Sequence, residues 1–84
     1  EERLKINLIA AEAIAKQIKL RQLSGQIVVD FLGLERRESR QLVTQKVEKR
    51  LAILPNRFEV VPMNSLGLVC LSLQRLYPAF HESK

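Results

Sequence analysis

The 84-residue chain contains one cysteine, one histidine, no tryptophan, three glycines and three prolines. A single cysteine excludes an internal disulfide, and with one histidine it supplies too few ligands for a structural zinc site. No apolar run approaches the roughly 20 residues that a membrane span needs, and no segment resembles a signal peptide. We therefore expect a cytoplasmic protein without a membrane span, in which Cys70 is a small buried core residue.

The overall composition is that of one small globular unit. Apolar residues make up 46% of the chain, and its length suits a single domain over residues 1–84. The net charge is +5, from 14 lysines and arginines against 9 aspartates and glutamates. Excess positive charge favours phosphate-bearing partners such as nucleic acid, although ordinary solvated helices carry it as well.

Residues 4–23 predict a helix, because apolar side chains recur at intervals of three and four. The expected buried stripe is Leu4, Leu8, Ala11, Ala15 and Ile18. Glu12 and Lys16 are spaced for an ion pair on another face of this helix. Asn7 is a plausible cap that would shorten the helix at its start, and Gly25 follows where the helix should stop.

Residues 26–32 form a short apolar run that predicts a buried strand. Asp30 is the one residue in it that burial does not explain, since an ionised aspartate in an apolar element needs a partner. At the end of a strand, Asp30 suits a metal ligand. The residues alone leave open a more ordinary interpretation, in which Asp30 caps the next turn or pairs with an arginine.

The charged run at 35–40 leads into a second predicted helix that Pro55 ends. Its expected buried stripe is Val43, Val47, Leu51 and Leu54.

Two strands complete the predicted fold. Residues 58–61 alternate like a strand, and Pro62 marks its end or an exposed edge. A turn signal at 64–65 precedes residues 66–73, which are apolar on both faces and predict a central strand. The sequence therefore predicts an α/β protein, a small αβαββ unit with two helices and a mixed sheet, followed by a mobile tail over 77–84.

Two ordered runs carry a resemblance to a known family. Residues 7–31 read N-L-I-A-A-E-A-I-A-K-Q-I-K-L-R-Q-L-S-G-Q-I-V-V-D-F, and residues 66–76 read L-G-L-V-C-L-S-L-Q-R-L. They resemble the ribonuclease E/G family patterns N-L-E-A-A-x-E-I-A-R-Q-L-R-L-R-x-L-G-G-I-I-V-I-D-F and G-L-x-E-x-[ST]-R-[QK]-R-L. The similarity extends over about residues 6–80.

The resemblance implies part of a deoxyribonuclease-I-like subdomain from a magnesium-dependent endoribonuclease. Such enzymes cut single-stranded RNA during RNA processing and decay, and the full-length protein is expected to be a homo-oligomer. In the family, one aspartate of an upstream I-D-x-N motif and the aspartate of I-V-I-D-F bind Mg²⁺, for which Mn²⁺ is a possible substitute. Asp30 matches the second position and is the expected catalytic and metal-binding residue.

Four basic residues are candidates for RNA binding. Lys16, Lys19 and Arg21 belong to the first predicted helix, where the family has a basic run, and Arg75 belongs to the second motif. On the helix, a plain solvated face is at least as common an explanation.

The departures from the family patterns suggest a second hypothesis. Ile9 and Cys70 stand where the patterns have Glu, Leu73 stands where they have Arg, and Gly33 stands where an acidic residue often follows. The upstream I-D-x-N motif has no counterpart in these residues, so we expect the 84-residue chain alone to be inactive. The alternative is a non-catalytic RNA-binding or oligomerisation module that keeps the same fold.

Overall fold

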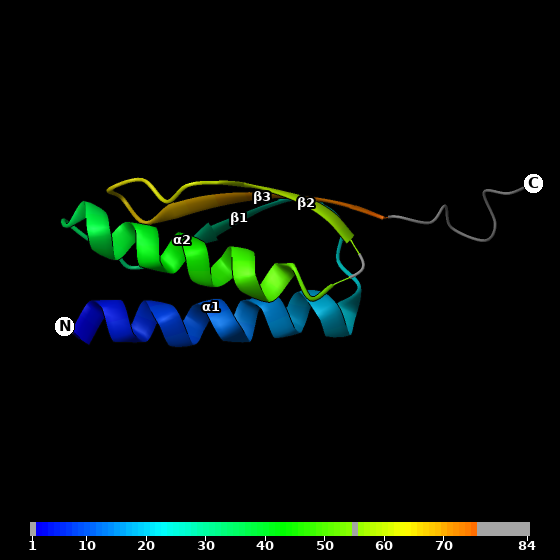
Figure 1. The fold of residues 1–84 in the computed structure, drawn as a ribbon, viewed down its shortest axis with the longest axis horizontal. Coiled ribbons are helices and arrows are strands. Elements are labelled where there is room, and N and C mark those ends of the chain that lie inside the picture. The colour runs from blue at the N-terminus through cyan, green and yellow to red at the C-terminus, as the bar shows by residue number, and fades with distance from the viewer. Residues whose placement is uncertain (1, 55, 76–84) are drawn as a thin grey trace, which may run out of the picture.

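The computed structural model describes residues 2–54 and 56–75, so the predicted tail at 77–84 lies outside the described residues. The elements in chain order are α1 (Glu2–Arg21), β1 (Gly25–Asp30), α2 (Arg37–Leu51), β2 (Asn56–Val61) and β3 (Leu68–Arg75) (Figure 1). The predicted α/β class and αβαββ order are confirmed, and the deoxyribonuclease-I-like assignment is consistent with them.

The three strands form an antiparallel sheet in the order β1-β3-β2. The prediction of a mixed sheet is therefore wrong, because β3 pairs antiparallel with both neighbours and keeps β1 and β2 apart. The predicted central position of β3 and edge position of β2 are confirmed. The expectation of a buried strand at 26–32 is wrong, since β1 ends at Asp30, lies at an edge and is at most half buried.

Both helices cover one face of the sheet and leave the other face open (Figure 1). Successive side chains of a strand point to opposite faces, so Val69, Leu71 and Leu73 of β3 are buried beneath the helices. Cys70 points to the open face and is exposed, which overturns the prediction that it belongs to the core. In the described part of the chain, neither helix is long and apolar enough to cross a membrane.

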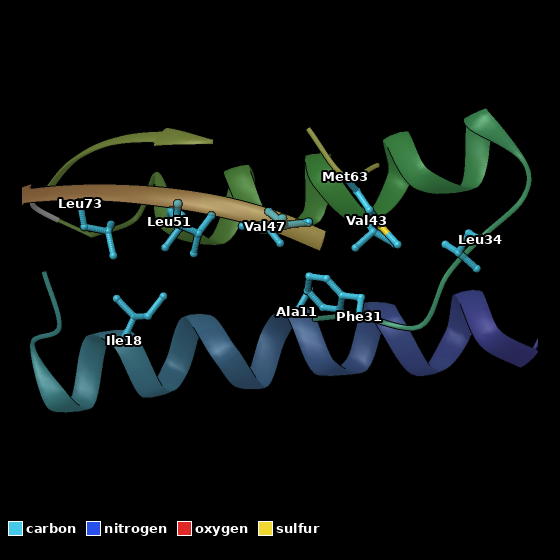
Figure 2. Packing of buried hydrophobic residues seen from close by; sticks show 11 residues of the cluster. Ala11, Ile18, Phe31, Leu34, Val43, Val47, Leu51, Met63 and Leu73 are labelled. Atoms are coloured by element: carbon cyan, nitrogen blue, oxygen red, sulfur yellow. The ribbon is translucent and has the colours of Figure 1, made fainter. Parts of the chain in front are cut away.

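The core lies between α1 on one side and α2 with β3 on the other, as Figure 2 shows. The residues of the two predicted helix stripes are buried or pack against this core, which confirms both periodicities. Helix α2 ends at Leu51, and its predicted terminator Pro55 lies outside the described residues. Leu54 still packs partly against the core beyond the helix end.

Asn7 lies inside α1 and is only 1% exposed, so the prediction of a cap that shortens the helix is wrong. Its Nδ2 donates to the carbonyl oxygen of Leu32 at 2.8 Å, and its Oδ1 accepts from the Leu32 backbone N–H at 3.0 Å. A buried amide needs such partners. Asn7 therefore joins α1 to the segment that follows β1.

Glu12 connects the two helices instead of pairing with Lys16. Its Oε1 lies 2.8 Å from Nη2 of Arg50 and 3.4 Å from Nζ of Lys46, both on α2. Arg50 and then Lys46 hold the pKa of the Glu12 carboxyl below its ordinary value of 4.5. The pairs are solvent-exposed, so their contribution to stability is small.

Gly67 makes the closest backbone approach of the three glycines. Its φ is +99°, and a Cβ on it would collide with the carbonyl oxygen of Phe31. Gly25 has a similar φ of +92°, but nothing lies within 4 Å of the place where its Cβ would stand.

Replacing Asn7 by alanine should destabilise the fold by about 1–3 kcal/mol, because both backbone groups of Leu32 lose their partner. Urea unfolding of Asn7→Ala and the exposed-site control Gln41→Ala measures the difference. A loss no larger than that of Gln41→Ala would contradict the role assigned to Asn7.

The stability that Glu12 contributes should depend on pH in a defined direction. The folded pKa is lowered, so the contribution is complete above pH 4.5 and is lost as pH falls through the folded pKa. The difference in unfolding free energy between the wild type and Glu12→Gln should therefore shrink below pH 4.5. A difference that grows with acidification would show that the ion pairs are not its source.

Gly67→Ala should cost roughly 3 kcal/mol or more, because it adds a backbone collision to the left-handed strain. Gly25→Ala is the matched control and should cost only about 1–2 kcal/mol, from the strain alone. Thermal unfolding of both variants tests this order. Equal losses would mean that the close approach to Phe31 relaxes freely.

Candidate metal site and basic groove

Asp30 is the last residue of β1 and faces away from the helices. The preceding residue, Val29, packs on the core, whereas Val28 points to the opposite face of the sheet and is 64% exposed. Since side chains alternate along a strand, Asp30 lies on the same face as Val28. Its cross-strand partner is Leu68, so Cys70 lies diagonally opposite on the same face. The carboxylate thus stands on the open face of the sheet.

The backbone directly after Asp30 is held on two sides. The N–H of Phe31 donates to the carbonyl oxygen of Gly67 at 2.8 Å, and the Phe31 side chain is buried. The next residue, Leu32, is held by the Asn7 amide on α1. Because both anchors lie within two residues of Asp30, they hold the backbone from which its carboxylate projects.

The Asp30 carboxylate is exposed, and no group in residues 2–54 and 56–75 forms a hydrogen bond or ion pair with it. Within this part of the chain, Asp30 therefore neither caps the next turn nor pairs with an arginine. An accessible carboxylate oxygen is a ligand that Mg²⁺ accepts while keeping most of its waters. The same described residues hold no cluster of three His, Cys, Asp or Glu side chains, so a metal site at Asp30 would need ligands from elsewhere.

Lys16 and Lys19 line an open groove on the helical side of the molecule, where α1 meets the end of α2. The groove has a volume of about 490 Å³. The sheet lies between it and the face that carries Asp30. These two lysines therefore do not belong to the site around Asp30, and the prediction that they bind RNA stays a prediction.

Arg21 and Arg75 lie toward the opposite end of the sheet from Asp30. Arg21 is the last residue of α1, just before β1 begins, and its Nε donates to Oε1 of Gln17 at 3.0 Å. Arg75 ends β3, seven residues beyond the partner of Asp30, which is roughly 23 Å along a strand. The structure thus brings none of the four predicted RNA-binding residues next to Asp30, and their role in RNA binding stays a prediction.

The sequence alone did not predict that Asn7 and Gly67 hold the backbone next to Asp30. Asn7 falls on the helical stripe that continues through Ala11 and Ile18, and a polar residue on a buried stripe signals a satisfied internal amide. Gly67 lies just after the turn before β3, where a glycine signals a close backbone approach. Asn7 and Gly67 each contact the segment after Asp30, and both lie far from that segment in sequence.

Comparisons with known proteins agree with the motifs. The sequence profile of the Ribonuclease E/G family matches residues 1–76. Ribonuclease E of Haemophilus influenzae is 35% identical over 85 residues, covering 99% of this chain and 9% of that protein. Ribonuclease E of Nostoc sp. is 38% identical over 69 residues, covering 82% of this chain and 10% of that protein.

A third relative, Ribonuclease G of Escherichia coli, is 33% identical over 69 residues, covering 82% of this chain and 14% of that protein. The chain therefore spans 9–14% of the length of these three relatives. The profile match covers nearly the whole chain and includes Asp30, Asn7 and Gly67. This chain belongs to the ribonuclease E/G family.

Proposed function

We propose that this chain is part of a magnesium-dependent endoribonuclease, in which Asp30 supplies one of the metal-binding carboxylates. The observation that carries the proposal is the exposed Asp30 carboxylate, fixed at the end of β1 and without a partner among the described residues. Family membership and relatives named Ribonuclease E and Ribonuclease G support a nuclease. The second carboxylate would come from outside these 84 residues, so the chain alone is expected to be inactive.

When bound, Mg²⁺ activates water and stabilises the charge that develops on the attacked phosphate. Asp30 would hold and orient the ion, and its exposure on the open face leaves room for waters and for a phosphodiester. The anchors through Phe31 and Leu32 would keep the carboxylate in place during the reaction. Mn²⁺ accepts the same oxygen ligands and would replace Mg²⁺.

The proposed substrate is single-stranded RNA, in agreement with the net charge of +5 and the names of the relatives. The site around Asp30 does not require the lysines of α1, which lie on the other side of the sheet. A cytoplasmic location and a homo-oligomeric full-length protein stay predictions.

One observation favours a second function, a non-catalytic RNA-binding or oligomerisation module with the same fold. Cys70 lies on the open face diagonal to Asp30, at the position where the family pattern has Glu. The substitution removes a carboxylate from the neighbourhood of Asp30. A module that has lost cleavage would tolerate this change.

Asp30→Asn in the full-length protein should lower RNA cleavage by roughly 100-fold or more, because the amide replaces a charged metal ligand. Cleavage of a labelled single-stranded RNA in Mg²⁺ and in Mn²⁺ measures it, and the unfolding midpoint should stay unchanged. Glu59→Gln is the matched control, since Glu59 is an exposed carboxylate on the same face and should not matter.

The outcomes separate the two functions. Full cleavage by Asp30→Asn would remove Asp30 from the mechanism. A wild-type protein that binds the RNA but does not cleave it with either metal would identify the non-catalytic module.

A further inference from the structure

From the groove between α1 and the end of α2, we infer a docking site for an acidic amphipathic helix of a partner protein. The site is independent of the proposed nuclease chemistry, because the sheet separates it from Asp30. Three features of the groove, as the described residues form it, support this partner: an apolar lining, two lysines without an acidic partner and the absence of aromatic side chains.

The groove has an apolar lining that no other described residue covers. Ile9 is 65% exposed and Ile53 is 68% exposed, and both line the groove together with Ala13 and Leu54. Large exposed aliphatic side chains grouped in a concave surface indicate a docking site rather than a solvated face.

Helix α1 carries a second apolar stripe outside its core-facing one. Ile9, Ala13 and Leu20 follow at helical spacing, with Lys16 between them, and Leu20 is 68% exposed. The groove residues from Ile9 to Lys19 extend roughly 15 Å along the helix axis. An exposed stripe of this length beside a second helix is the surface that an amphipathic helix fits.

The charge around the apolar lining is positive. Lys16, Lys19 and Arg50 line the groove with one carboxylate, Glu12. Arg50 and Lys46 already neutralise Glu12, and within the described residues no acidic group pairs with Lys16 or Lys19. The two lysines are therefore available for carboxylates of a partner, and charge complementarity selects an acidic one.

RNA fits the groove less well than a helix does. Single-stranded RNA is held by a positively charged groove together with aromatic side chains that stack on its bases. The described residues that line this groove supply the charge but no aromatic side chain. Ile9 also stands where the family pattern has Glu, which makes this groove more apolar and more positive. The change favours an acidic amphipathic partner.

A synthetic peptide tests the inference on the full-length protein. The probe is a fluorescent peptide of about 18 residues with leucines at i, i+3, i+4 and i+7 and glutamates elsewhere. Fluorescence anisotropy should show tighter binding than for a scrambled peptide of the same composition. Binding should weaken with added salt, because the lysines are exposed.

Ile9→Glu should weaken peptide binding by about tenfold or more, since it removes an apolar contact and adds repulsion. Leu42→Glu is the matched control, because Leu42 is a half-exposed helical residue away from the groove, and it should bind like the wild type. Asp30→Asn should bind the peptide normally, so the inference succeeds or fails independently of the nuclease proposal.

Two results would overturn the inference. One is equal binding of the acidic and scrambled peptides by the wild type, or equal binding of the acidic peptide by the wild type and by Ile9→Glu. The other concerns Lys16→Glu with Lys19→Glu in the non-cleaving Asp30→Asn protein, if these substitutions lower its affinity for oligouridylate and leave its affinity for the peptide unchanged. That result would assign the groove to RNA.

Discussion

The pair of hydrogen bonds between the Asn7 amide and the backbone of Leu32 holds the helical layer to the strand that carries Asp30. An unpaired amide in this position would be costly, since Asn7 is almost completely buried. Together with the hydrogen bond from the Phe31 N–H to the Gly67 carbonyl oxygen, these two hydrogen bonds fix the backbone directly after β1. Without these hydrogen bonds, the end of an edge strand, where Asp30 lies, would be less constrained than the rest of the sheet.

The open face of the sheet and the helical face offer different chemistry. The open face presents Asp30 from a fixed strand end, with Cys70 diagonal to it. The helical face presents aliphatic side chains and lysines in a groove. Because the sheet separates the two faces, the RNA site proposed at Asp30 and the peptide groove proposed on the helices do not overlap.

The periodic parts of the fold could be predicted, because a stripe of buried side chains leaves its spacing in the sequence. The stripes through Ala11 and Ile18 and through Val43 and Val47 are of this kind. Asp30 could be singled out because a carboxylate in an apolar strand demands an explanation. The residues that hold the backbone after Asp30 could not be predicted, since Asn7 and Gly67 lie far from that segment in sequence.

The amino-acid sequence by itself determined the order of helices and strands, the family and the candidate aspartate, because these depend on local spacing and on ordered motifs. Only the tertiary structure decided that β3 pairs antiparallel with both β1 and β2, and that Asp30 and Cys70 lie on the open face of the sheet. It also decided that Glu12 reaches Arg50 and Lys46 instead of Lys16. The direction in which strands pair and the ion pairs between helices depend on which distant segments pack together, and local spacing does not encode that choice.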